Sequence, residues 1–231
     1  MNADLRRLLA GVNAVLLDFD GPVCSVFAGY PAPRVAAELV DVLWRHGVDV
    51  PPDLAGEPDP LDVLRRTGAA GDQDITRAVE DALCAAERRA VETAEPTPYG
   101  REVIVAARQA GLPVAVVSNN SARAVTDYLV AHRLVGHISP VVGRAYAEPA
   151  RMKPNPEPIL RAVRALGEPP ARCVLVGDSL SDIEGARAAG VAVVGYANRP
   201  AKVDAFRRVG IGAVVTSMSE IAAALTNLAG G

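Results

Sequence analysis

The chain has 231 residues, of which 50% are hydrophobic and only 4% aromatic, so a sizeable core of mainly aliphatic side chains can be buried. The formal net charge of -3 gives no electrostatic reason to expect nucleic acid or an acidic membrane surface as a partner. No apolar run approaches the ~20 residues that a membrane-spanning helix needs, and we find no signal peptide at the N-terminus.

The cysteines and lysines are few. Three cysteines lie far apart and are odd in number, which predicts neither a disulfide framework nor a cysteine metal site. We therefore expect a reduced, cytoplasmic protein. Of the 24 basic residues, 22 are arginine, and the only lysines are Lys153 and Lys202. A lysine at either position is thus unusual for this chain.

Short continuous apolar runs predict strands that are buried on both faces. They occupy residues 14–18, 114–118, 138–142, 173–177, 191–195 and 213–215. Helical patterns follow at residues 100–110, 122–132, 156–166, 183–189, 201–208 and 218–228. This alternation predicts an α/β fold, in which a parallel sheet with right-handed crossovers is flanked by helices.

Residues 24–95 interrupt the alternation, because they contain no clear strand. Their patterns predict helices near residues 34–46, 59–67 and 73–93, separated by turns rich in proline and glycine. We therefore expect two domains. A core domain comprises residues 1–23 and 96–231, and a small helical domain, residues 24–95, is inserted into it.

Two carboxylates directly follow the first predicted strand, in Asp18-Phe19-Asp20-Gly21. Carboxylates at this spacing can act as a nucleophile and as its general acid/base partner. An aspartate that attacks phosphorus forms an aspartyl-phosphate and divides one difficult step into two. The alternative is a solvated turn at the end of a strand, since Asp-Gly is a common turn pair.

Two further motifs could bind a phosphoryl group. Ser118 and Asn119 follow the second strand, where the Ser118 hydroxyl and a free backbone amide favour an anion; the alternative is an ordinary helix cap. Lys153 precedes Pro154, which favours an extended backbone and a stiff loop. Because the chain otherwise uses arginine, a lysine here indicates a need for a compact positive charge.

Asp178 and Asp182 follow the fourth predicted strand, in Gly-Asp-Ser-Leu-Ser-Asp. In open parallel sheets, ligands bind at the carboxyl ends of the strands, so these acids and the earlier motifs are expected to converge. Clustered carboxylates need a cation, and hard oxygen ligands favour Mg²⁺. The alternative is a helix N-terminus with acidic residues that suit its dipole.

Taken in order, these four motifs resemble those of the haloacid dehalogenase-like (HAD) hydrolases, over the whole chain and including the position of the insert. The resemblance is to phosphatases with a helical cap, and among them to phosphoglycolate phosphatases. It implies a Rossmann-like core and a cap that closes over the site. It also assigns roles to residues. Asp18 would be the nucleophile and a Mg²⁺ ligand, and Asp20 would be the acid/base, with its backbone carbonyl on the metal. Ser118, Asn119 and Lys153 would bind the phosphoryl group. Asp178 and Asp182 would be the remaining metal residues.

The resemblance implies Mg²⁺-dependent hydrolysis of a small phosphorylated metabolite by a monomer or homodimer. A sugar-phosphate mutase on the same site is one alternative, although Tyr30 stands where such mutases typically carry histidine. A phosphonatase is disfavoured because residues 24–95 contain no lysine. A non-catalytic binding or regulatory module is the alternative from another class, and such a module is expected to lose at least one of the central motif residues.

Substrate contacts are expected from the segment that follows the nucleophile. Cys24 and Tyr30 are close to it in sequence, and Arg34 could meet a second anionic group. Pro22 departs from the family pattern, which usually has threonine or valine after Asp-Gly. We expect this proline to stiffen the connection to the cap without removing any chemical group.

Overall fold

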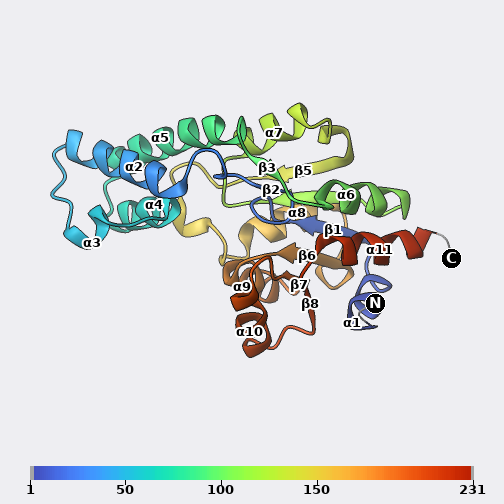
Figure 1. The fold of residues 1–231 in the computed structure, drawn as a ribbon. Coiled ribbons are helices and arrows are strands. Elements are labelled where there is room, and N and C mark those ends of the chain that lie inside the picture. Colours follow the sequence, from blue (N-terminus) through green and yellow to red (C-terminus); the bar gives the residue numbers. More distant parts are fainter. Residues whose placement is uncertain (1–2, 230–231) are drawn as a thin grey trace.

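The computed structural model describes residues 3–229, and a six-stranded parallel sheet lies at its centre (Figure 1). The strand order is β5-β4-β1-β6-β7-β8. The strands are β1 (Ala14–Leu17), β4 (Val114–Val117), β5 (Ile138–Val142), β6 (Cys173–Gly177), β7 (Ala192–Tyr196) and β8 (Ala213–Val215). The order reverses direction at β1, which pairs with β4 on one side and with β6 on the other. The predicted α/β fold is confirmed.

Helices cover both faces of the sheet. One face packs against α1 (Ala3–Leu9), α6 (Gly100–Gln109), α7 (Ala122–Ala131) and α11 (Met218–Ala229). The other packs against α8 (Glu157–Leu166), α9 (Leu180–Ala188) and α10 (Pro200–Arg208). Along β1, Val15 and Leu17 point into the first layer and Ala14 and Leu16 into the second. Both strand faces are therefore buried, which explains the continuous apolar runs.

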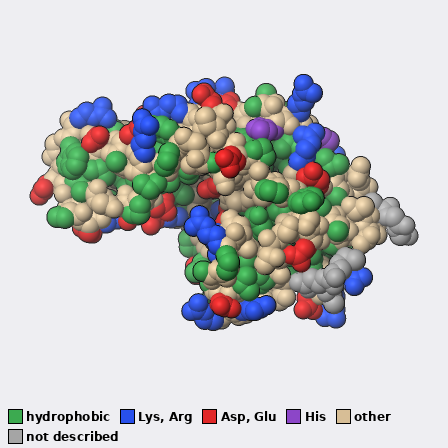
Figure 2. Space-filling view, in the orientation of Figure 1, with side chains coloured by type: hydrophobic (Ala, Val, Ile, Leu, Met, Phe, Trp, Pro, Cys, Tyr) green, Lys and Arg blue, Asp and Glu red, His purple; other side chains and the backbone are tan. Residues whose placement is uncertain are grey.

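The insert forms a helical lobe beside the sheet, on the left in Figures 1 and 2. It contains α2 (Ala32–Arg45), α3 (Pro52–Ala55), α4 (Pro60–Ala69) and α5 (Gln73–Val91). These helices share a hydrophobic cluster built around Leu39, Leu64 and Leu83, each fully buried. This apolar centre is distinct from the two that flank the sheet, and among the described buried residues Met152 is its one member from outside the lobe.

Two short strands and two short helices escape the sequence patterns. The chain enters and leaves the lobe through β2 (Cys24–Ser25) and β3 (Glu95–Pro96), an antiparallel pair of two residues each. The expectation of no strand in residues 24–95 was therefore wrong at both ends of that range. Strands of two residues are too short to show a hydrophobic periodicity in the sequence. The helices α1 and α3 were missed because one is seven residues long and the other is a single turn.

A buried ion cluster ties the lobe to the sheet. The guanidinium of Arg144, in the loop after β5, lies 2.7 Å from Glu80 Oε1 and 2.8 Å from Glu87 Oε1, both on α5. All three side chains are almost completely buried. Arg144 also donates to the carbonyl oxygen of Asn119, and Glu87 accepts from the Ser121 amide. Helix α5 is thus bonded directly to the loop that follows β4.

Among residues 3–229, every helix is too short or too polar to span a lipid bilayer.

Candidate active site

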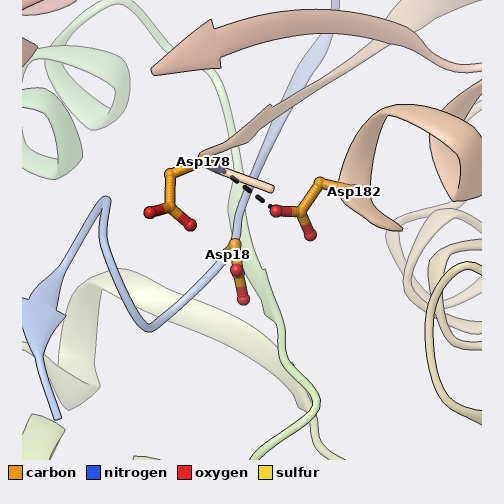
Figure 3. Close-up of side chains that lie close together, drawn as sticks. All are labelled: Asp18, Asp178 and Asp182. Atoms are coloured by element: carbon orange, nitrogen blue, oxygen red, sulfur yellow. Dashed lines mark hydrogen bonds between the residues drawn. The ribbon is translucent and has the colours of Figure 1, made fainter. Parts of the chain in front are cut away.

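The polar motifs meet at the carboxyl ends of the three central strands. Asp18 follows β1, Ser118 follows β4 and Asp178 follows β6, and these strands are neighbours in the sheet. Each of Asp18, Asp178 and Asp182 offers one carboxylate oxygen that lies within 4.8 Å of the others (Figure 3). This is the topological switch point at which open α/β sheets bind ligands.

Lys153 lies beneath this cluster and is only 1% exposed. Its ammonium is 2.9 Å from Asp18 Oδ1 and 2.6 Å from Asp182 Oδ1, and it donates to the carbonyl of Val117 at 2.8 Å. All three ammonium protons therefore have acceptors. A fixed cation is held against two carboxylates in the centre of the site.

Burial and close contact shift the pKa values of the acids in this cluster in opposite directions. Burial raises the pKa of Asp18 well above its usual value, and Asp182 and Asp178 raise it further, while Lys153 opposes the shift. Burial also disfavours the charged form of Asp182, but the Lys153 ammonium outweighs it and lowers the pKa of that carboxyl. The positive charge of Lys153 thus outweighs the cost of burying a charged Asp182, but offsets only part of that cost for Asp18. An added cation would relieve the remaining repulsion.

Asp182 is held by a capping box at the start of α9. Its Oδ2 accepts from the Ser179 hydroxyl at 2.7 Å and from the backbone amides of Asp178 and Ser179 at 3.2 and 3.1 Å. Its Oδ1 accepts from Lys153. Both oxygens are therefore already bonded within the protein, and Asp182 fixes the position of Lys153.

Gly21 allows Asp178 to approach the first motif. Its φ is +105°, a conformation that suits glycine, and an added Cβ would lie 2.4 Å from Cγ of Asp178. The sequence Asp-Phe-Asp-Gly therefore ends in glycine for a physical reason. A side chain there would push one acid of the cluster away.

Replacing Gly21 with alanine is expected to lower the free energy of unfolding by about 1–3 kcal/mol through backbone strain, with a further loss from the displaced Asp178. Chemical denaturation measures the total loss of unfolding free energy. The matched control is Gly47→Ala, which has a φ of +76° but no heavy atom within 4 Å of the added Cβ. Equal losses in the two variants would show that the contact with Asp178 is unimportant.

Asp20 occupies the turn that leads into β2. Its Oδ1 accepts from the Val26 amide at 3.0 Å. Burial raises the pKa of Asp20 to about 6, although the Val26 hydrogen bond opposes this shift. The carboxyl is thus suited to exchange a proton near neutral pH, as an acid/base group must.

Ser118 and Asn119 serve partly as a scaffold. The Ser118 hydroxyl donates to Asn120 Oδ1 and accepts from the Asn120 amide, both at 3.1 Å. Asn119 pairs with the backbone of Lys153 in both directions, donating to its carbonyl at 3.1 Å and accepting from its amide at 2.9 Å. The N-cap of α7 is Ser121, so Ser118 is not a helix cap.

A cavity of about 600 Å³ opens above the cluster, between the sheet and the lobe. The sheet side contributes Asp18, Asp20, Ser118, Asn119, Lys153 and Asp178. The lobe contributes Phe27, Pro33, Pro58, Asp59, Leu61 and Arg65. The residues predicted for catalysis and phosphate binding are thus brought together around one space.

The three predicted substrate contacts lie outside this lining. The side chain of Cys24 is fully buried in the hydrophobic layer that also contains Val15 and Leu17. Tyr30 donates to Glu38 at 2.5 Å, and the largely exposed Arg34 lies over the Tyr30 ring, 5.0 Å from its centroid. The Cys24 backbone is bridged to Asp20, but its side chain points into the core, whereas Phe27 of the same segment does line the cavity. Nearness to Asp18 in sequence therefore does not decide which side chains face the cavity.

A family model for haloacid dehalogenase-like hydrolases matches residues 12–190, which include all four motifs. The chain belongs to the haloacid dehalogenase-like hydrolases. Among curated proteins, it is similar to phosphoglycolate phosphatase of Escherichia coli (strain K12), with 33% identity over 98 residues. It is also similar to protein CbbY of Rhodobacter capsulatus, with 40% identity over 100 residues. Each match covers 42% of this chain, and it spans 38% and 43% of the two relatives, which is less than half of either.

Solved HAD structures share the fold. A haloacid dehalogenase-like family hydrolase from Streptococcus pneumoniae covers 93% of this chain and 98% of its own, with a TM-score of 0.65 and 15% identity. A subfamily IA HAD hydrolase from Geobacter sulfurreducens covers 93% and 97%, with a TM-score of 0.58 and 21% identity. These likenesses extend over both the sheet and the lobe.

A divalent metal fits the donor set of this HAD site. Carboxylate oxygens from Asp18, Asp178 and Asp182 converge, and the hard oxygen donors match the preference of Mg²⁺. Of Asp178 and Asp182, Asp178 is the more available to a metal, because both oxygens of Asp182 accept hydrogen bonds from protein donors.

Two site residues were missed in the sequence. Arg65 of α4 is the lobe's one cation in the cavity lining, and its guanidinium lies 3.3 Å from the carbonyl of Lys153. No signal separated it from 21 other arginines. Lys202 of α10 lies 2.5 Å from Asp178 Oδ2. The scarcity of lysine that pointed to Lys153 pointed to Lys202 equally.

Proposed function

We propose that this HAD hydrolase is a Mg²⁺-dependent phosphatase, which hydrolyses a small-molecule phosphate monoester through an aspartyl-phosphate on Asp18. One observation carries the proposal. Asp18 lies at the sheet's switch point, in contact with the Lys153 ammonium and within 4.8 Å of Asp178 and Asp182, at the floor of an open cavity. A nucleophile, a fixed cation and a metal-binding cluster therefore share one space.

The proposed first step is attack by Asp18 on phosphorus. Its Oδ1 accepts from Lys153 and from the Phe19 amide at 2.7 Å, which leaves Oδ2 as the attacking oxygen. As the new O–P bond forms, the bond to the leaving oxygen breaks, and Asp20 gives that oxygen its proton. The positive charge of Lys153 offsets the charge on the phosphoryl oxygens, and the Ser118 hydroxyl stabilises it by turning its proton from Asn120 Oδ1 to a phosphoryl oxygen.

In the second step Asp20, now a carboxylate, removes a proton from water as the water attacks phosphorus. The acyl-phosphate bond breaks, phosphate leaves and Asp18 is restored. Bound through Asp18, the Asp20 carbonyl and Asp178, Mg²⁺ would offset the charge of nucleophile and phosphate. Asp182 acts in both steps by holding Lys153 in place.

We propose that residues 24–95 act as the cap and residues 1–23 and 96–231 as the core domain. The cavity lies between these two parts, so closure of the lobe would exclude water from it. We also propose that the protein is cytoplasmic and is a monomer or a homodimer.

The substrate is proposed to carry a second anionic group. Arg65 faces the cavity from the lobe, and its charge is shared with Asp62 at 2.5 Å. A guanidinium can bind a carboxylate in a bidentate manner. Phosphoglycolate, the substrate in the name of the Escherichia coli relative, has a carboxylate beside its phosphate.

The test is phosphate release from a panel of esters, with and without Mg²⁺. The panel contains phosphoglycolate, its analogue ethyl phosphate, which lacks the carboxylate, and glucose phosphates. We expect release that requires Mg²⁺, is lost in chelator and is fastest with phosphoglycolate. Conversion of one glucose phosphate into another without phosphate release would favour the mutase. Absence of any turnover with the whole panel would favour a binding module.

A further inference from the structure

The chain's second lysine lies at the edge of the acidic cluster. Lys202 places its ammonium 2.5 Å from Oδ2 of Asp178, and Asn198 donates to the same oxygen at 2.9 Å. Neither donor contacts Oδ1. Figure 3 shows one Asp178 oxygen turned toward the space that Asp18 and Asp182 share and the other turned away. Two donors thus hold the carboxylate by a single oxygen.

Strand pairing brings these residues together. Gly177 at the end of β6 is paired with Gly195 in β7, so the loops after the two strands run side by side. Asp178 is in one loop and Asn198 in the other. Helix α10 begins at Pro200, and its first turn carries Lys202 toward the cluster.

The contact differs from an ordinary surface ion pair. The Lys202 side chain is only 28% exposed and that of Asp178 14%, so water screens the pair less than usual. The chain chooses lysine at two positions against arginine at 22, and both lysines contact carboxylates of this cluster. A compact ammonium suits contact with one oxygen, whereas a guanidinium suits two.

We propose that Lys202 is a positioning residue for the metal ligand Asp178. The inference rests on the proposed function, which assigns Asp178 to Mg²⁺. Lys202 and Asn198 fix the carboxylate through Oδ2, so that Oδ1 is presented to the metal before it binds. Partners that orient a metal ligand in this way typically contribute about 10–100-fold to metal affinity.

Titration calorimetry of the metal-free protein with MgCl₂ alone tests this inference. Lys202→Met is expected to raise the Mg²⁺ dissociation constant by about tenfold or more. Asn198→Leu, which removes the other donor, is expected to weaken binding in the same direction. The matched control is Arg207→Met, which removes the same charge from an exposed position on the same helix.

The direction of the change decides the outcome. Removing a positive charge near a cation site would tighten Mg²⁺ binding if simple repulsion dominated. Unchanged or tighter binding in Lys202→Met, with metal-free thermal unfolding like that of the wild type, would therefore overturn the inference. Wild-type protein that binds no Mg²⁺ would overturn it together with the metal assignment. A wild type that binds Mg²⁺ and a variant that binds it equally would leave the phosphatase proposal standing.

Discussion

Replacing Asp18 with asparagine is expected to lower phosphate release by about 10⁴-fold or more, the scale on which a covalent nucleophile contributes. The amide has the same shape but cannot form the acyl-phosphate. Folding should be preserved, because burial and the neighbouring Asp182 already oppose the Asp18 charge. Release under saturating Mg²⁺ and ester, together with thermal unfolding, measures both parts.

The matched control is Asp204→Asn, an exposed carboxylate on α10, which should leave turnover unchanged. Mass spectrometry of wild-type protein quenched during turnover should find phosphate on Asp18. Near-normal, Mg²⁺-dependent turnover in Asp18→Asn would exclude this residue as the nucleophile.

Replacing Arg144 with methionine is expected to lower the free energy of unfolding by about 3–5 kcal/mol. The guanidinium is fully buried and bonded to Glu80, Glu87 and the Asn119 carbonyl. Its loss would leave two buried carboxylates facing each other without a counterion. Denaturant unfolding at neutral pH gives the value.

A second variant separates lost charge compensation from lost packing. Adding Glu80→Gln and Glu87→Gln to Arg144→Met removes the unpaired charges and should recover at least half of the loss. The surface control Arg123→Met breaks an exposed pair with Asp127 and should cost less than about 1 kcal/mol. A loss of that small size in Arg144→Met would show that the buried cluster does not stabilise the fold.

The sheet and the polar cluster at its edge could be predicted because their signals are local. Each central strand is a short apolar run that ends in a polar residue, and parallel strands bring those ends together. Asp18, Ser118 and Asp178 are therefore placed by strand order alone, whereas Lys153 lies in the longer loop after β5 and is placed by the fold of that loop. The same reasoning fails for Cys24, since the two-residue strand β2 turns its side chain into the core.

The long-range polar contacts could not be predicted. Arg144 is one of 22 arginines, and nothing near it in sequence indicates that α5 supplies its two partners. The pairing of Asn119 with the Lys153 backbone likewise depends on a loop conformation that no periodicity encodes. Such contacts are selected by tertiary geometry, so they appear only once the fold is known.

The ion cluster of Arg144 also bears on how this chain could exchange parts with its relatives. Glu80 and Glu87 precede Arg144 by 64 and 57 residues, so a gene crossover between them would separate the partners. A recombinant that took its lobe from another family member would bury Arg144 against whatever α5 then offered. Lobe and sheet are therefore expected to be inherited together in this lineage, and designed chimaeras should transfer α5 and the loop after β5 as one unit.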